Sequence, residues 1–258
     1  MTHKVAILGS GPTGLAAAVA AIDSGYRVLI ASQSDEPSTQ YGCQYLHAPI
    51  PGYEDVPHTR VSYRLNGTAD QYRRKVYGES WAGKVSPEDF VGEHDAWDIR
   101  TTYRRMWDDL HTNKKVKFIQ TIRIDYGFLP SAVIDYHAEA IISTIPAPRL
   151  CFRQSHMFLN HIIYAAGSTN PVPGSEDIIL CDGTDAHDWY RIASVFSYNT
   201  TEWSKNPVDT RTPVVAVPKP LKTDCDCHVE VSRIGRYGKW QKSYLVHQAY
   251  PEVMDILK

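Results

Sequence analysis

The chain has 258 residues, of which 43% are hydrophobic and 22% charged, and its formal net charge is −2. This composition is ordinary for a soluble globular protein with a sizeable core, and the small net charge excludes strong attraction of the whole chain to polyanions. Apolar runs stay well below the roughly 18 residues of a membrane span, and the N-terminus leads straight into a strand-like segment. We therefore expect a cytoplasmic protein without signal peptide or membrane contact. Five irregularly spaced cysteines favour reduced thiols over disulfides.

The first elements in chain order predict a βαβ unit. Residues 4–8 are a short apolar run that ends at Gly9, and an alanine-rich helical segment closed by Gly25 follows it. Residues 27–32 again have the character of a buried strand. Between the first strand and the helix lies GSGPTG, residues 9–14, which fits the G-x-G-x-x-G pattern of dinucleotide-binding loops.

Each glycine of this loop has a physical role at a pyrophosphate. The first permits a tight turn, the second lets a phosphate approach the backbone, and the third allows close packing of helix on strand. The N-terminus of the helix then presents its free N–H groups to the phosphates. We therefore predict a dinucleotide site formed by Gly9, Gly11, Pro12, Thr13 and Gly14.

The pattern departs from its usual form at the end of the second strand. An acidic residue that binds the adenosine ribose is expected about 20 residues after the loop. This sequence has Ser32 and Gln33 there, and Asp35 and Glu36 follow. Either a neutral side chain holds the ribose, for which Ser32 is the candidate, or the following loop folds one acid back.

A long loop rich in Pro, Gly, Ser and Asp spans residues 33–59, and loops of this length usually carry a function. It contains YGCQYLHAPIPG, residues 41–52, in which Gln44 and His47 could reach a cofactor or a substrate. An equal alternative is that His47 is a hydrogen-bonded structural histidine.

The middle of the chain is locally basic. Residues 60–123 hold 13 Lys and Arg against 9 Asp and Glu, and residues 68–77 and 98–112 within this segment have helical periodicity. The positive charge is either a solvated face or a wall that faces an anionic substrate. The members of such a wall would be Tyr72, Arg73, Arg74, Lys75, Arg104 and Arg105.

Strands dominate the second half of the chain. We predict strands over residues 118–124, 132–136, 140–145, 161–167 and 191–198, and a closing helix over residues 251–258. A basic and aromatic stretch, RIGRYGKWQKSYLVHQAY, precedes that helix. Within it Gly235 permits close approach, and the planar guanidinium of Arg236 can pair with a pyrophosphate. This stretch and GSGPTG are predicted to hold one cofactor from opposite ends, and the alternative is a basic edge strand before an ordinary terminal helix.

A cysteine-rich fragment, Cys225-Asp226-Cys227-His228, has the composition of half a zinc site. A second ligand pair with matching spacing does not stand near it in the sequence. We therefore predict a surface turn at this position and no metal.

Several segments together resemble flavoproteins of the amine-oxidase and UDP-galactopyranose-mutase group. They are the G-x-G-x-x-G start, AIISTIP (140–146), DWYRIASVFSYNTTEW (188–203) and GRYGKW (235–240). The resemblance implies FAD as the cofactor and an α/β fold with a Rossmann-like FAD-binding domain of the glutathione-reductase type. That domain would comprise residues 1–59 and 140–258, and residues 60–139 would form a small inserted α+β substrate domain.

The same resemblance implies roles for particular residues. Tyr190 and Arg191 would lie beside the flavin and the substrate, and Gly235 and Arg236 would hold FAD. The last helix of that family begins with Asn-Met-Asp-Gln, and here only Gln248 matches, which makes it the candidate for a further cofactor contact.

A closer resemblance is to small phage-encoded FAD proteins, in which QYLHxPIP, WDIRxxY and GRYGKW are also found. Some of these act in the hypermodification of thymidine in phage DNA, where a flavin releases an amino-acid group by oxidising a C–N bond. The resemblance implies an FAD-dependent oxidoreductase acting on an amine or a modified nucleobase in the host cytoplasm, with Arg191, Tyr190 and His47 as catalytic candidates. The basic segment would be the DNA contact. Two alternatives stay open, a redox-neutral flavin-dependent sugar-nucleotide mutase and a dinucleotide-binding module without catalysis.

Overall fold

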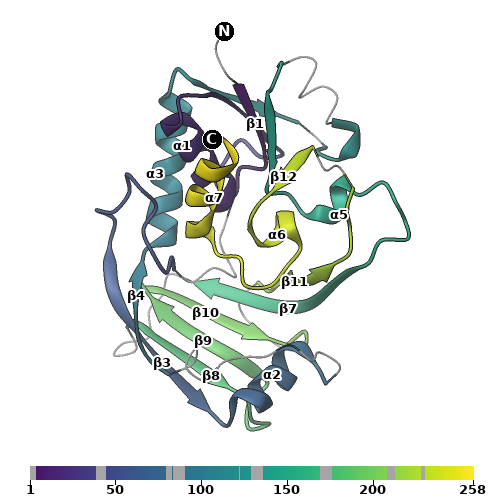
Figure 1. Ribbon diagram of the computed structural model, residues 1–258. Helices are drawn as coiled ribbons and strands as arrows, with labels where there is room; N and C mark the ends of the chain where they lie inside the picture. Colours follow the sequence, from purple (N-terminus) through teal and green to yellow (C-terminus); the bar gives the residue numbers. More distant parts are fainter. Residues whose placement is uncertain are drawn as a thin grey trace.

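Two β-sheets make up the protein, and the chain crosses between them several times (Figure 1). One sheet lies with both chain ends and most of the helices in the upper half of this view, and the other forms the lower half. The computed structural model describes residues 4–38, 45–79, 83, 91–121, 123–128, 136–168, 176–207, 213–227 and 230–258.

The first sheet has five parallel strands in the order β12-β6-β1-β2-β5. Its strands are β1 (Lys4–Leu8), β2 (Arg27–Ser32), β5 (Val116–Gln120), β6 (Ala140–Ser143) and β12 (Val231–Arg233). The central strands are near-continuous apolar runs because a parallel sheet is covered on both faces. The predicted βαβ opening is confirmed, and the parallel sheet confirms the α/β class.

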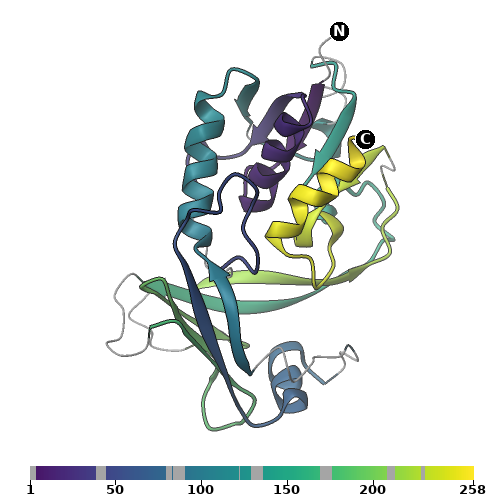
Figure 2. The ribbon, with the colours of Figure 1, turned by 60° about the vertical axis from the view of Figure 1, so that its left-hand side comes forward.

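Three helices lie side by side against one face of this sheet (Figure 2). They are α1 (Pro12–Asp23), α3 (Ile99–Thr112) and α7 (Ala249–Ile256). The residues of α1 from Gly14 to Ala21 are all buried, because small side chains let the sheet and both neighbouring helices approach it closely. The hydroxyl of Tyr250 in α7 donates a hydrogen bond of 2.8 Å to Asp23 at the end of α1. The C-terminus of the chain is thereby fixed beside the first helix.

The second sheet has seven strands in the order β11-β7-β10-β9-β8-β3-β4. Its strands are β3 (His58–Asn66), β4 (Gly92–Trp97), β7 (Phe158–Ser168), β8 (Ile178–Asp182), β9 (Trp189–Val195), β10 (Tyr198–Trp203) and β11 (Val215–Thr223). Neighbouring strands run antiparallel except β3 and β8, which are parallel. The predicted strand at 161–167 is confirmed as part of β7.

The remaining elements are short. They are α2 (Ala69–Tyr77), α5 (Ala147–Leu150), α6 (Gly235–Lys239) and the 3₁₀ turns η2 (Tyr126–Phe128) and η3 (Val246–Gln248). The helix α2 starts with a reciprocal capping box between Thr68 and Gln71, and Asp98 caps α3 through the backbone N–H of Arg100. Both helices predicted in the middle segment are therefore confirmed. Within the part of the chain that the structure describes, no helix has both the length and the apolar character needed to cross a membrane.

One predicted strand is in fact two. Residues 191–198 are divided between β9 and β10 by a hairpin turn at Phe196 and Ser197, whose φ angles are 53° and 58°. A two-residue turn with positive φ at both positions matches the right-handed twist of the flanking strands. Periodicity did not reveal this turn, because neither residue is one of the glycines or asparagines that usually mark it. The strand expected at 118–124 ends at Gln120, and that at 132–136 lies almost wholly outside the described residues.

The two sheets do not follow the predicted division of the chain. The segment 60–139 supplies β3 and β4 to the seven-stranded sheet, but it also supplies α3 and β5 to the five-stranded layer. Conversely, the strands from β7 to β11 come from the segment expected to belong to the cofactor domain. The physical reason is that strand pairing joins segments far apart in sequence, which local periodicity cannot specify.

Candidate functional site

A cavity of about 570 Å³ lies where the loop after β1 faces the seven-stranded sheet. Its wall combines the first glycine-rich loop, the segment 45–47, the residues after β6, and parts of β9 and β11 with the C-terminal stretch. The described residues that line it are Gly9, Gly11, Pro12, Thr13, Ser38, Tyr45, Leu46, His47, Tyr63, Tyr77, Thr144, Ile145, Pro146, Arg191, Val217, Lys219, Gly235, Arg236, Tyr237, Tyr244, Leu245, Val246 and His247.

The GSGPTG loop forms one end of this cavity, and its glycines are used in different ways. A Cβ atom on Gly14 would lie 2.0 Å from the backbone oxygen of Gly9, so Gly14 allows the loop to pack on α1. Gly9 has a φ of +103°, which favours glycine. A Cβ on Gly11 would meet nothing within 4 Å, and Gly11 is the N-cap of α1. The free N–H groups at the start of α1 are therefore open to an anion at the cavity.

The C-terminal stretch closes on this loop from the other side. The strand β12 joins the sheet beside β6, and the backbone N–H of Ile234 donates to the oxygen of Ser143 at 3.0 Å. A Cβ atom on Gly235 would lie 2.5 Å from Cγ2 of Thr13, and a Cβ on Gly238 2.5 Å from the oxygen of Ser143. Both glycines permit this close packing. The two glycine-rich stretches therefore meet at one end of the cavity, and that they hold one cofactor between them stays a prediction.

Arg236 brings an unpartnered donor to the cavity. Its Nε atom is buried and has no hydrogen-bond partner among the described residues, although the side chain lies on the cavity wall. A buried donor left without a partner costs about 1–3 kcal/mol. An anionic group beside the glycine-rich loop would satisfy this donor, so the residues present fit a pyrophosphate.

The expected ribose contact at Ser32 is not supported by its position. Its hydroxyl lies 2.5 Å from that of Ser10 and donates to the backbone oxygen of Ser34 at 2.7 Å. The hydroxyl of Ser32 therefore already has hydrogen-bond partners at the end of β2, and the residue does not line the cavity. At the next position, Gln33 accepts a hydrogen bond from Arg149, so a neutral and a cationic side chain stand where an acid is usual.

A buried charge cluster lies on the seven-stranded sheet. The carboxylate of Glu202 in β10 is fully buried and lies 2.5 Å from Arg191 and 2.9 Å from Lys219. The hydroxyl of Tyr190 donates a short hydrogen bond to the same carboxylate. Arg191 and Lys219 line the cavity, whereas Tyr190 and Glu202 lie behind them.

A β-bulge explains how two consecutive residues reach one carboxylate. Arg191 pairs with Glu202, but the next pair along joins Trp189 with Trp203, so Tyr190 is the extra residue of β9. Successive side chains in a regular strand point to opposite faces, and a bulge changes that alternation. The bulge lets both Tyr190 and Arg191 bind Glu202.

Glu202 and Lys219 in this cluster both have a lowered pKa, but for different physical reasons. Burial alone would raise the pKa of Glu202, but the charges of Arg191 and Lys219 outweigh it and lower this pKa to about 2. Burial lowers the pKa of Lys219 to about 8, and the carboxylate of Glu202 only partly opposes this effect. Lys219 is thus a cavity residue that can hold or release a proton under mildly alkaline conditions. Sequence reasoning missed Lys219, because a lysine within VPKPLK carries no motif.

The remaining predicted site residues are found in different places. His47 lies on the cavity wall, with its ring centroid 4.6 Å from that of Tyr45 and 6.1 Å from that of His247. Gln248 is exposed, and its side chain accepts a hydrogen bond of 2.8 Å from the backbone N–H of Leu245, so it does not line the cavity. This position does not support the predicted cofactor contact of Gln248, because its side chain closes its own 3₁₀ turn. Gln44 lies outside the described residues.

The basic residues of the middle segment do not form one wall. The helix α3 lies beside the five-stranded sheet, whereas α2 lies at the far end of the other sheet (Figures 1 and 2). Arg74 binds Asp70, Lys75 binds the buried Asp182 at 2.7 Å, and Arg105 binds Asp55 at 2.8 Å. Arg73 also binds Asp70, and Tyr72 is buried. Contact with DNA through this segment stays a prediction.

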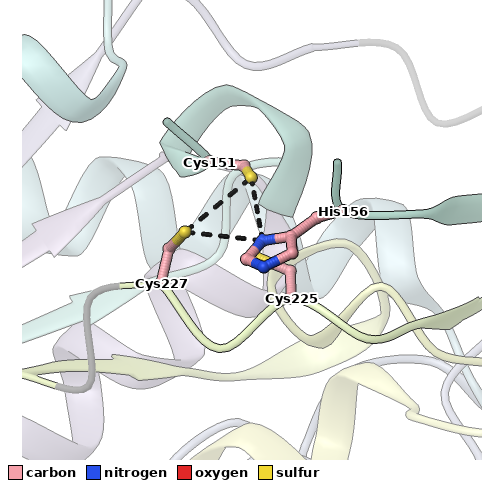
Figure 3. A group of neighbouring side chains, drawn as sticks. All are labelled: Cys151, His156, Cys225 and Cys227. Atoms are coloured by element: carbon pink, nitrogen blue, oxygen red, sulfur yellow. Dashed lines mark hydrogen bonds between the residues drawn. The ribbon is translucent and has the colours of Figure 1, made fainter. Parts of the chain in front are cut away.

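A second cluster gathers residues that the sequence keeps far apart. Cys225 and Cys227 lie with Cys151 and His156, and one ligand atom from each lies within 4.8 Å of the others (Figure 3). The expectation that the Cys225–Cys227 fragment lacks partner ligands is therefore wrong. His228, the last residue of the predicted fragment, lies outside the described residues.

No protein-family model matches the sequence, and a search of curated proteins finds no match. Solved structures do share the fold. A p-nitrophenol 4-monooxygenase from Pseudomonas putida DLL-E4 is similar with a TM-score of 0.61 and 10% identity, over 99% of this chain and 78% of that one. A 2,6-dihydroxypyridine-3-hydroxylase from Arthrobacter nicotinovorans has a TM-score of 0.56 and 12% identity, over 100% and 83% of the two chains. A flavin-dependent brominase has a TM-score of 0.56 and 10% identity, over 100% and 78%. At these identities the likeness shows a common fold.

Proposed function

We propose that the protein is an FAD-dependent oxidoreductase with an FAD-binding domain of the glutathione-reductase type. The observation that carries the proposal is the cavity, which begins between the GSGPTG loop and Arg236 and extends to Arg191 and Lys219 on the seven-stranded sheet. A dinucleotide with a reactive ring at one end needs a site that is anion-binding at one end and able to take a substrate at the other. The common fold with a flavin-dependent brominase supports the choice of flavin.

Specific residues would hold the cofactor. The N–H groups at the start of α1 and the guanidinium of Arg236 would bind the pyrophosphate, with Gly11 and Gly235 leaving room for it. The segments Tyr45–His47 and Tyr244–His247 would form walls for the rest of the molecule. Bound FAD would supply the acceptor for two electrons from the substrate.

We propose that the substrate is an amine, oxidised at its C–N bond. A flavin accepts electrons from the unprotonated amine, and the two cationic side chains Arg191 and Lys219 disfavour an ammonium group beside them. Above its pKa, which burial lowers to about 8, Lys219 is neutral and would accept the proton that the amine releases, while Arg191 keeps its positive charge. Arg191 would act as a substrate-binding residue.

The amine would be an amino-acid group on a modified thymidine of phage DNA, as in the phage flavoproteins that the sequence resembles. The Nε atom of Arg191 is buried and lacks a hydrogen-bond partner among the described residues, although another nitrogen of the same guanidinium binds Glu202. A carboxylate or carbonyl oxygen of the substrate would satisfy it. This assignment makes the carboxylate of an amino acid the group that Arg191 recognises.

A second candidate function is hydroxylation of an aromatic substrate. It is favoured by the fold shared with p-nitrophenol 4-monooxygenase and 2,6-dihydroxypyridine-3-hydroxylase. The same two cations would then stabilise a phenolate instead of binding an amine. Such a reaction consumes dioxygen and an external reductant, whereas amine oxidation reduces the flavin with electrons from the substrate itself.

The test begins with the visible spectrum of the purified protein and the identity of any cofactor released by denaturation. Recovered or reconstituted FAD supports the proposal, and a protein that takes up NAD but no FAD contradicts it. Anaerobic addition of amino-acid-substituted thymidine nucleosides should bleach the flavin without NADH or NADPH. Bleaching only by a reduced nicotinamide, stimulated by a phenol, would favour the hydroxylase, and turnover only after reduction by dithionite would favour a mutase.

A further inference from the structure

Three sulfur atoms and one imidazole nitrogen meet outside the cavity. The Sγ of Cys151 lies 3.9 Å from the Sγ of Cys227 and 3.3 Å from Nδ1 of His156, and the Sγ of Cys227 lies 3.5 Å from the same nitrogen. The Sγ of Cys225 lies within 4.8 Å of these atoms (Figure 3). Cys227 is buried and the other three are partly buried, so the cluster is not a solvated surface turn.

These separations match the edges of a zinc coordination tetrahedron. With Zn–S bonds of about 2.3 Å and Zn–N bonds of about 2.0–2.1 Å, tetrahedral angles place two sulfurs about 3.8 Å apart and a sulfur and a nitrogen about 3.6 Å apart. The observed distances of 3.9, 3.3 and 3.5 Å fit these edges closely. Thiolate and imidazole are the ligands that zinc prefers in structural sites.

The surroundings of the four ligands have the chemistry of an outer shell. While Nδ1 of His156 faces the sulfurs, its Nε2 lies 3.4 Å from the carboxylate of Asp226. A carboxylate at the second ring nitrogen fixes the ring and its tautomer in metal sites. Arg233 donates to the backbone oxygens of Cys225 and Cys227 at 3.2 and 2.5 Å, and its NH2 lies 3.5 Å from Sγ of Cys225. A cation there offsets the excess negative charge of three thiolates around a divalent ion.

The ligands come from two separate connections between the sheets. Cys151 follows α5 and His156 precedes β7, so this pair lies on the passage from β6 to β7. Cys225 and Cys227 lie on the return passage from β11 to β12. The first passage begins with Thr144–Pro146 and the second leads through β12 into Gly235–Tyr237, and both of these segments line the cavity.

We propose that Cys151, His156, Cys225 and Cys227 bind one Zn²⁺ ion as a structural site. Four protein ligands leave no coordination position for a substrate, which assigns the ion to the fold and not to catalysis. It ties the two passages together behind the cavity wall. A loss of metal is therefore expected to loosen the Gly235–Tyr237 segment without removing any group from the cavity.

The test measures metal directly, independently of flavin or activity. Protein purified without chelator should contain about one zinc per chain by plasma mass spectrometry, as a four-ligand site requires. Replacement by Co²⁺ should give the thiolate-to-cobalt charge-transfer band and the visible d–d bands of a tetrahedral site. Cys227→Ser should lose these bands, and Asp226→Asn should weaken zinc binding about 10- to 100-fold.

A matched control is Cys181→Ala, which removes a buried thiol in β8, outside the cluster. It should keep the full zinc content and the cobalt spectrum. Because Cys227→Ser could fail to fold, the cobalt spectrum of the unmodified chain stands as a separate measurement. Folded protein that takes up neither Zn²⁺ nor Co²⁺ overturns the proposal. So does a disulfide between any two of Cys151, Cys225 and Cys227, detected by peptide mapping after thiol alkylation in denaturant and chelator.

Discussion

Gly235 lies directly against the side chain of Thr13, so close that a Cβ atom at position 235 would come within 2.5 Å of Cγ2 of Thr13. The two residues belong to the two glycine-rich stretches near opposite ends of the sequence. Their contact brings Arg236 and the N-terminus of α1 to the same end of the cavity, where we propose that a pyrophosphate binds. Gly235 also has a φ of +69°, in the left-handed region that favours glycine.

We expect Gly235→Ala to lower both stability and FAD binding. The left-handed backbone alone costs an L-residue about 1–2 kcal/mol, and the contact with Thr13 adds to this. Gly25→Ala is the matched control, because Gly25 has a φ of +90° but a Cβ there would meet nothing within 4 Å. Chemical denaturation and flavin titration of both variants check the prediction. Equal losses in the two variants would show that the contact with Thr13 has no role.

Arg236→Ala should weaken FAD binding while the protein stays folded. A hydrogen bond to a charged group is worth about 1.5–3 kcal/mol, which corresponds to a Kd raised about 10- to 150-fold. The melting temperature without cofactor should not fall, because the change removes a buried donor that lacks a partner among the described residues. Flavin fluorescence titration and thermal melts measure the two effects. The exposed Lys222 in β11 offers the control Lys222→Ala, which should bind FAD normally.

Glu202→Gln should destabilise the protein strongly at neutral pH. It leaves Arg191 and Lys219 buried without their carboxylate, and breaking a buried pair in this way costs about 3–5 kcal/mol. Urea denaturation compares the free energy of unfolding of the variant with that of the original chain. If the free energy of unfolding falls by no more than in an ordinary surface substitution, solvent must reach the cluster.

The original chain should lose stability in acid through the same carboxylate. The pKa of Glu202 is lowered from 4.5 to about 2 in the folded state, so its contribution is present above pH 4.5 and is lost as the pH falls toward 2. Urea denaturation at a series of pH values measures this slope. The slope in this window should become shallower in Glu202→Gln, and an unchanged slope would assign it to other acids.

Lys219 should control the pH dependence of substrate oxidation. Its pKa is lowered to about 8, so the neutral amine that can accept a proton becomes the major form above that pH. The rate of anaerobic flavin bleaching by an amine should therefore rise with pH through about 8. Lys219→Arg stays charged and should abolish the rise, while FAD binding, measured by fluorescence, stays near normal. A rise that persists in Lys219→Arg would move the proton acceptor elsewhere.

The local features of the fold could be predicted from the sequence. The βαβ opening with GSGPTG, the capped helices α2 and α3, and the choice of Gly235 and Arg236 as cavity residues all follow from short-range conformation and residue chemistry. These features depend on residues within a few positions of one another. They can be predicted from hydrophobic periodicity, from the positions of glycine and proline, and from capping side chains.

Tertiary structure alone decided which distant residues meet. Lys219 reaches Glu202 because β11 and β10 both flank β7. Tyr190 reaches the same carboxylate through a β-bulge, which the sequence of β9 alone does not predict. Cys151 and His156 meet Cys225 and Cys227 because two passages between the sheets run side by side. Sequence by itself determined the α/β opening and the glycine-rich end of the cavity, since these are properties of contiguous chain. The charge cluster and the sulfur–imidazole cluster depend on strand order and crossover geometry. Both are set by packing between distant segments, and hydrophobic periodicity does not specify which of these segments pair.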